Sequence, residues 1–269
     1  MAERIIGIDF SGAEKAGEAI WIAESQVDGE RVRIESCRSA AGLFGSGPER
    51  SRCLAALVDF IAGQRNAIIG CDFPFSLPSA MIGAGGWRTF ALGLASRFAS
   101  ADEFLADCRR RANGREIRRA CDHESRVPFA AYNLRIYRQT YHGIRDVLAP
   151  LIRADSAAVL PMERPRPDRP WVIETCPAST LKHAGLYPSY KGRGDAARAA
   201  RRHIVTGLVR KGLLAPLSRS LRCLAIDNQG GDALDSMVAA AATARAHRAG
   251  AFRDSIPNRC ELVEGRVYY

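Results

Sequence analysis

The chain has 269 residues, of which 47% are hydrophobic and 25% charged, and its formal net charge is +10. These proportions are typical of a folded globular protein and exclude a disordered chain, collagen and a coiled coil. The longest apolar stretch, Met237 to Ala244, is far shorter than the ~20 residues that a membrane-spanning helix needs. The first residues lack the basic start and uncharged core of a secretory signal. We therefore expect a cytoplasmic protein without a membrane segment, folded as a single α/β domain over residues 1–269.

The positive charge and the cysteines bear on possible partners and ligands. The 39 lysines and arginines exceed the 29 aspartates and glutamates, which is compatible with a polyanionic partner such as DNA or RNA. Nearly all of these basic residues are arginine and alanine is abundant, so codon bias explains the charge equally well. The eight cysteines lie far apart without a Cys-x-x-Cys pair, which argues against structural zinc and against disulfide bonds.

Strand and helix patterns alternate through the first quarter of the chain. Arg4 to Phe10 is a short apolar run that contains an acid near its end and is followed by a turn signal, which is typical of a buried strand. Asp28-Gly29 is a strong hairpin dipeptide, so the runs on either side of it should form antiparallel strands. The predicted order is three strands, a helix and a further strand, over Arg4 to Phe10, Ala19 to Glu24, Arg31 to Cys37, Leu54 to Ile61 and Ala67 to Asp72.

The pattern changes between residues 79 and 170, which we predict to be a mainly helical insertion. Helical spacing runs over Arg97 to Arg111 and over Gln139 to Ile152, and a Pro- and Arg-rich stretch closes the segment. The insertion holds a group of arginines that fit either a solvated helix face or contacts with phosphate. They are Arg109, Arg110, Arg111, Arg115, Arg118 and Arg119.

The predicted core resumes after residue 170. Trp171 to Thr175 has the pattern of a strand, and Ala196 to Lys211 that of a helix with a basic face. Gly230-Gly231 breaks the chain before an Ala-rich helix over Asp232 to His247. Cys260 to Tyr268 is a candidate closing strand.

Acidic residues end three of the predicted apolar strands. Asp9, Asp72 and Glu174 meet at one edge of the sheet if these strands are parallel neighbours, and ligands of open α/β sheets bind at that edge. Asp232 and Asp235 lie three apart at the start of a helix, so they share one face and complete the same cluster. Like charges at such spacing repel and need cations, and carboxylate oxygens suit Mg²⁺ or Mn²⁺. We therefore predict that all five acids are catalytic and that the four aspartates bind the metal.

Each acid also has an explanation that involves no ligand. Asp232 and Asp235 fit N-cap and N3 positions, where they would bond to free amides and favour the helix dipole. Asp72 suits a turn cap, and Glu174 suits an exposed strand end or the start of the next helix. Asp9 is the hardest to explain in this way, because an unpaired carboxylate inside an apolar run costs stability.

Four short motifs surround the predicted acids. They are Gly7-Ile8-Asp9-Phe10-Ser11-Gly12, Gly70 to Pro78 (GCDFPFSLP), Ile173-Glu174-Thr175-Cys176-Pro177 and Asp232-Ala233-Leu234-Asp235-Ser236. In this order they resemble a family of unknown function, domain of unknown function 429, whose members are predicted RNase H-like-fold nucleases. The resemblance spans nearly the whole chain and implies a mixed five-stranded sheet flanked by helices. It also implies metal-dependent hydrolysis of phosphodiester bonds, with Asp9, Asp72 and either Asp232 or Asp235 as metal ligands and Glu174 nearby.

Two other functions stay open beside a nuclease that acts on DNA or RNA. Asp9-Phe10-Ser11-Gly12 also resembles the strand-turn element with which actin-like kinases hold nucleotide phosphates, and Ile226 to Gly231 is a candidate second phosphate loop. Such kinases use two lobes of this fold, whereas this chain has length for one lobe and an insertion. The third interpretation is a non-catalytic nucleic-acid-binding module whose acids only cap helices.

Overall fold

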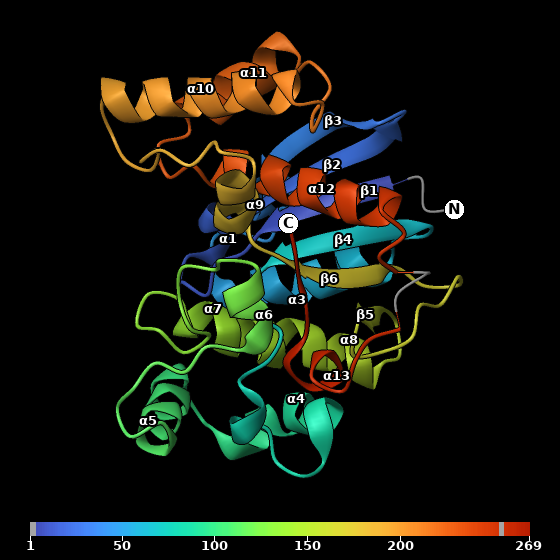
Figure 1. The fold of residues 1–269 in the computed structure, drawn as a ribbon, viewed down its shortest axis with the longest axis vertical. Helices are drawn as coiled ribbons and strands as arrows, with labels where there is room; N and C mark the ends of the chain where they lie inside the picture. Colours follow the sequence, from blue (N-terminus) through green and yellow to red (C-terminus); the bar gives the residue numbers. More distant parts are fainter. Residues whose placement is uncertain (1–3, 253–255) are drawn as a thin grey trace.

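A mixed sheet of seven strands forms the centre of the molecule, with helices on both faces (Figure 1). The computed structural model describes residues 4–252 and 256–269. The strand order is β3-β2-β1-β4-β6-β5, and β7 pairs with β6 beside this path. The strands are β1 (Arg4–Asp9), β2 (Trp21–Asp28), β3 (Arg31–Ser39), β4 (Ala67–Asp72), β5 (Ala158–Leu160), β6 (Trp171–Thr175) and β7 (Val267–Tyr268).

The predicted order of three strands, a helix and a strand is confirmed in β1, β2, β3, α3 (Arg50–Ala62) and β4. The predicted number of five strands is wrong, because the sheet has seven. β5 spans only three residues, which is too short for an apolar alternation to be recognised in a sequence. The predicted closing strand over Cys260 to Tyr268 is confirmed only in its last two residues, which form β7, whereas Glu261–Glu264 form a helix. β5 also lies within residues 79–170, so the last part of the segment predicted as a helical insertion contributes to the sheet.

The strand directions bring several carboxyl ends to one edge of the sheet. β2 runs antiparallel to β1 and to β3, whereas β1 pairs with β4, β4 with β6 and β5 with β6 in parallel. The register places Asp9 of β1 opposite Asp72 of β4, and Cys71 opposite Glu174 of β6. The strand-end acids predicted from the sequence therefore lie along the same edge.

Most of the segment between β4 and β5 is helical. The helix predicted from Arg97 to Arg111 begins instead at Ala101, because the Ser100 hydroxyl accepts a hydrogen bond from the Glu103 amide and caps a new helix. The elements here are η1 (Ser79–Met81), α4 (Gly86–Arg97), α5 (Ala101–Arg111), α6 (Ala120–Glu124), α7 (Tyr137–His142), the π-helix η2 (Gly143–Leu148) and α8 (Ala149–Arg153). The other helices are α1 (Ala16–Ala19), α2 (Ala40–Phe44), α9 (Pro177–His183), α10 (Asp195–Arg210), α11 (Arg219–Asp227), α12 (Asp232–Arg248) and α13 (Glu261–Glu264). No helix among the described residues is both long enough and apolar enough to traverse a bilayer.

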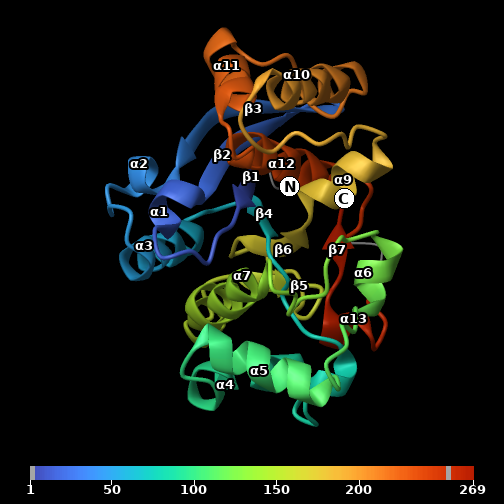
Figure 2. The same cartoon turned by 90° about the vertical axis from the view of Figure 1, so that its left-hand side faces the viewer.

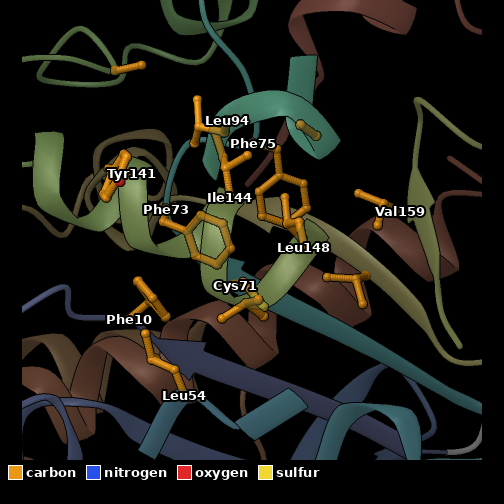
Figure 3. Close-up of a cluster of buried hydrophobic side chains, with 14 of the residues drawn as sticks. Phe10, Leu54, Cys71, Phe73, Phe75, Leu94, Tyr141, Ile144, Leu148 and Val159 are labelled. Carbon is orange, nitrogen blue, oxygen red and sulfur yellow. The ribbon is translucent and has the colours of Figure 1, made fainter. Parts of the chain in front are cut away.

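Two hydrophobic cores lie on the two faces of the sheet. Ile6 and Ile8 of β1 belong to the core on the side of α3, η2 and α8, whereas Ile5 belongs to the core beneath α12. This division follows from the alternation of side chains along a strand. Figure 3 shows the first core, in which side chains from the strand ends pack against those of η2. They include Phe10, Cys71, Phe73, Phe75, Ile144 and Leu148.

Two glycines allow α12 to lie directly on β1 and β4. Gly7 and Gly70 pair in register, and a Cβ atom on Gly7 would clash with the Ser236 carbonyl oxygen of α12. A Cβ atom on Gly70 would clash with the Thr243 hydroxyl of the same helix. Residues two positions apart on a strand share a face, so the aspartates that follow these glycines also face α12.

Candidate active site

Asp9 and Asp72 end two neighbouring parallel strands and lie opposite each other. Asp9 is 7% exposed, and Asp72 is partly buried. Their position in the strands places both carboxylates on the face covered by the N-terminal turn of α12. The structure therefore brings together the first two acids of the predicted site.

The first turn of α12 supplies two further carboxylates. Asp235 is buried, and its carboxylate accepts a hydrogen bond from the Tyr190 hydroxyl at 2.7 Å and pairs with the Lys191 ammonium at 2.7 Å. Asp232 is partly buried and lines the same cavity. Gly231 is the N-cap residue of α12, so the N-cap position predicted as the alternative for Asp232 is wrong. The capping explanation for Asp235 requires bonds to backbone amides of its own helix, whereas its carboxylate bonds to the side chains of Tyr190 and Lys191.

Burial and mutual repulsion raise the pKa values of these carboxyl groups. The pKa of Asp9 lies well above its usual range because of burial and because of the charge of Asp235. Burial and the same neighbour raise the pKa of Asp72 to about 8. Burial also raises the pKa of Asp232 and of Asp235, although Lys191 opposes the effect at both. Burial acts to lower the pKa of Lys191, but Asp235 and Asp9 outweigh it and raise that pKa.

The four aspartates line a cavity of about 420 Å³ at the carboxyl edge of the sheet. One wall comes from the insertion, with residues between Val127 and Gln139, and the opposite wall from the loop between α9 and α10, with Tyr187, Tyr190 and Lys191. Figure 2 looks at this side of the molecule, with α9 and α12 above and α7 below. The Gln139 side chain donates a hydrogen bond to the Phe10 carbonyl, which holds α7 against the end of β1.

Glu174 faces away from the four aspartates. It pairs in register with Cys71 rather than Asp72, so strand alternation directs its side chain to the other face of the sheet. Its carboxylate accepts hydrogen bonds from the Arg119 guanidinium at 2.8 Å and from the Phe75 amide at 2.9 Å. Glu174 still borders the cavity. Its contacts give it a structural role, and a catalytic role stays a prediction.

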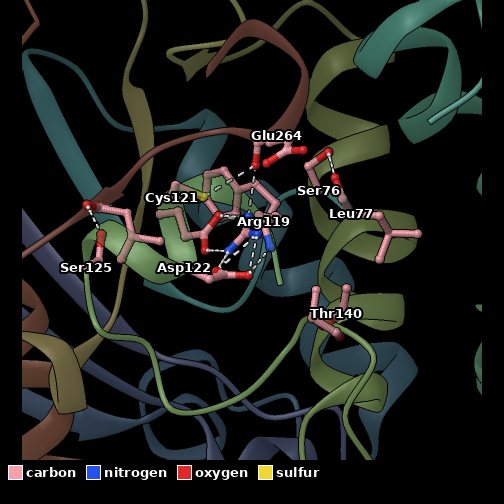
Figure 4. Close-up of polar contacts among 12 residues, drawn as sticks. Ser76, Leu77, Arg119, Cys121, Asp122, Ser125, Thr140 and Glu264 are labelled. Carbon is pink, nitrogen blue, oxygen red and sulfur yellow. Dashed lines mark hydrogen bonds and ion pairs between the residues drawn. The ribbon is translucent and has the colours of Figure 1, made fainter. Parts of the chain in front are cut away.

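Arg119 is fully buried and connects separate parts of the chain (Figure 4). Its guanidinium pairs with Asp122 of α6 at 2.7 Å and with Glu174 of β6, and it donates to the backbone oxygen of Glu264 in α13 at 3.0 Å. The prediction that Arg119 belongs to a solvated face or contacts phosphate is therefore wrong. The Arg119-x-x-Asp122 spacing within one helical turn was the available sequence signal for this pair.

A comparison with protein-family models matches residues 7–261 to the family described as "Protein of unknown function (DUF429)". The chain belongs to this family. Comparison with the curated proteins and with the solved structures gives no match. The segment matched to DUF429 contains all five predicted acids and Lys191, and it ends before β7.

The carboxylates of this DUF429 protein can be assessed as ligands of a metal ion by their arrangement, their charge and their donor atoms. Within residues 4–252 and 256–269, no group of three or more His, Cys, Asp or Glu side chains is arranged to hold a metal ion. The Lys191 ammonium contacts one of the four aspartates, Asp235. The four aspartates supply only oxygen donors, which Mg²⁺ and Mn²⁺ prefer, and when all four are ionised one ammonium offsets only one of their charges. The donor set therefore fits a divalent ion in charge and in ligand type.

Sequence reasoning missed Lys191 and Tyr190, both of which contact Asp235. Lys191 is one of four lysines in the DUF429 chain and precedes Gly192-Arg193-Gly194, and this is the signal that could have identified it. Phe129, Arg135 and Tyr187 of the cavity walls carry no motif. They lie on loops, whose course is not determined by hydrophobic periodicity.

Proposed function

We propose that this protein is a divalent-metal-dependent nuclease built on an RNase H-like core. The observation that carries the proposal is a charge imbalance: four aspartates from β1, β4 and α12 line one cavity, and the Lys191 ammonium contacts one of them, Asp235. Buried carboxylates are costly unless they are paired or bind cations. Groups with strongly perturbed pKa values in a cleft are candidates for function.

The topology supports the RNase H-like assignment. The order β3-β2-β1-β4-β6, with β2 antiparallel to its neighbours, agrees with the arrangement that the sequence motifs imply. The acid on the first strand and the acid on the fourth lie side by side, and the acids of the last long helix lie over them. The motifs that resemble those of the predicted RNase H-like nucleases contain these same acids.

Some residues of the cavity would bind the metal ion, and others orient those ligands or contact the substrate. Asp9, Asp72 and Asp235 would hold a divalent ion, together with Asp232. When bound, such an ion would lower the pKa of a water molecule and would stabilise negative charge on a leaving oxygen. The Tyr190 hydroxyl orients the Asp235 carboxylate, as outer hydrogen bonds do around metal ligands. The Lys191 side chain is 55% exposed, so its ammonium can also donate to a phosphate oxygen.

The net charge of +10 supports a nucleic-acid substrate. Positive charge continues from the cavity into the next helix: Arg193 follows Lys191 by two residues and is exposed, and Arg202 is exposed on α10. Arginines of this kind bind the phosphate backbone without reading sequence.

The decisive experiment compares the wild type with Asp9→Asn. Calorimetric titration with Mn²⁺ and Mg²⁺ measures metal binding, and a mixed pool of labelled DNA and RNA measures cleavage. We expect the wild type to bind metal and to cleave, and the variant to lose cleavage and most of the metal affinity while its circular dichroism is unchanged. Asp59→Asn, at an exposed aspartate of α3, is the matched control and should retain both. Full cleavage by a folded Asp9→Asn, or a wild type that neither binds metal nor cleaves, contradicts the proposal.

A further inference from the structure

The cavity has an aromatic part that metal chemistry does not require. Phe129 of the insertion and Tyr187 of the α9–α10 loop line the same cavity as the aspartates. Tyr187 is 44% exposed, and Phe129 is partly exposed. Each ring therefore presents surface to a ligand in the cavity. Ligand sites typically combine such apolar walls with a few polar groups at defined positions.

A cation accompanies each of these rings. The Arg135 guanidinium lies 5.3 Å from the centre of the Phe129 ring, and the Lys182 ammonium lies 5.2 Å from the centre of the Tyr187 ring. Arg135 also lines the cavity. Aromatic rings stack on nucleobases, and cations beside them contact the phosphates that link those bases. The wall with Phe129 and Arg135 thus offers the two contacts by which single-stranded nucleic acid is bound, and the opposite wall adds the Tyr187 ring and the Lys191 ammonium.

The size of the cavity favours one nucleotide over a double helix. Its volume of about 420 Å³ lies in the range of sites for single small ligands. In a duplex the faces of the bases are covered by neighbouring base pairs, so they are closed to protein side chains. An unpaired base has free faces, and it is the form that aromatic side chains recognise.

We propose that the cavity binds one unpaired nucleotide, with its base against Phe129 and Tyr187 and its phosphate toward the aspartates and Lys191. The inference rests on the proposed function, because it names the substrate class of the same site: a single strand or a free nucleotide, and not a duplex. It assigns Phe129 and Tyr187 to substrate binding.

Fluorescence anisotropy of a labelled, cleavage-resistant phosphorothioate oligothymidylate measures this binding apart from cleavage. We expect the full-length protein in Mg²⁺ to bind the single strand at least about tenfold more tightly than the same sequence in a duplex. Phe129→Ala and Tyr187→Ala should each weaken binding by about five- to a hundredfold. Tyr187→Phe keeps the ring and should keep the affinity. Leu134→Ala, at a 59% exposed residue between Phe129 and Arg135 that does not line the cavity, is the matched control and should bind like the wild type.

Competition with unlabelled thymidine monophosphate distinguishes the two sources of an unpaired nucleotide. Displacement by the monophosphate identifies a free nucleotide, and displacement by the strand alone identifies a polynucleotide; both support the proposal. Equal binding of the duplex, wild-type affinity in both alanine variants, or no binding of strand and monophosphate overturns it. If Phe129→Ala does not fold, the exposed Tyr187 and its two variants decide the question. The metal mechanism is judged separately by Asp9→Asn, whose cleavage result does not enter this binding measurement.

Discussion

Gly7 of β1 and Gly70 of β4 lie opposite each other in register, and the backbone of α12 passes over both of them. The missing side chains determine how closely the helix approaches the strands. The same approach brings Asp235 over the end of β1, where its negative charge raises the pKa of Asp9. Residues without functional groups therefore determine the geometry of the candidate site.

Gly7→Ala should destabilise the protein by about 1–3 kcal/mol, because the added methyl group overlaps the backbone of α12 at Ser236 and Ala240. Metal binding should weaken as well, since α12 carries two of the four aspartates. Urea unfolding and calorimetric titration measure the two effects. Gly93→Ala in α4 is the control: its Cβ atom would meet open space, and the free energy of unfolding should rise by about 0.5–1 kcal/mol. Equal stability of Gly7→Ala and the wild type contradicts the packing described.

Arg119→Met should lower the free energy of unfolding by about 3–5 kcal/mol, because it leaves Glu174 and Asp122 buried without their common cation. Arg119→Lys should restore only part of the loss, since an ammonium cannot make the same forked set of bonds. The exposed pair of Arg110 with Asp107 provides the comparison, and Arg110→Met should change stability by less than about 1 kcal/mol. If urea unfolding shows a similar loss of unfolding free energy for Arg119→Met and Arg110→Met, Arg119 has no special structural role.

Asp72→Asn should stabilise the metal-free protein at neutral and alkaline pH. An unfolded aspartate ionises near pH 4, whereas burial and the charge of Asp235 raise the pKa of Asp72 in the folded state to about 8. Between these values the folded state binds more protons than the unfolded state, so the contribution of Asp72 to stability falls as the pH rises. The variant lacks this loss, so its free energy of unfolding should exceed that of the wild type by about 1–3 kcal/mol at pH 8. The difference should shrink toward pH 4. Denaturant unfolding in chelator across this range is the measurement, and a difference independent of pH refutes the raised pKa.

Lys191→Met should make the protein more dependent on divalent ions for stability. Without the ammonium, the Tyr190 hydroxyl is the one side-chain partner left to Asp235 among residues 4–252 and 256–269, and the cavity gains net negative charge. We expect a lower Tm in chelator and a larger increase in Tm on addition of Mg²⁺ than in the wild type, because a bound ligand stabilises the folded state. Lys211→Met, at an exposed lysine just after α10, should respond to Mg²⁺ like the wild type. An equal increase for Lys191→Met and the wild type speaks against an ion near Asp235.

The strands with long apolar runs could be predicted closely from the sequence. β4 and β6 have the predicted bounds, and β1 differs by one residue, because a buried strand that ends in a turn or a proline leaves a clear local pattern. β5 was missed because its pairing with β6 is a long-range contact that three residues do not reveal. The closing strand was predicted over Cys260 to Tyr268, but β7 forms only at its last two residues, where it pairs with β6.

The acids of the site show a different limit of sequence reasoning. That Asp9, Asp72 and Glu174 all end parallel strands was predictable from the apolar runs, but the face to which each side chain points depends on register. Glu174 lies opposite Cys71, one residue short of Asp72, and this offset directs it to Arg119. A shift by one residue reverses the face of a side chain, and register is set by contacts across the sheet.

The order of the elements along the chain has a consequence for synthesis. β1 and β4, which carry Asp9 and Asp72, are made early, whereas α12 follows the whole insertion, α9, α10 and α11. Until α12 has left the ribosome and settled on Gly7 and Gly70, the cavity has no roof and its aspartates are not assembled. The candidate site is therefore completed only after most of the described chain has been made.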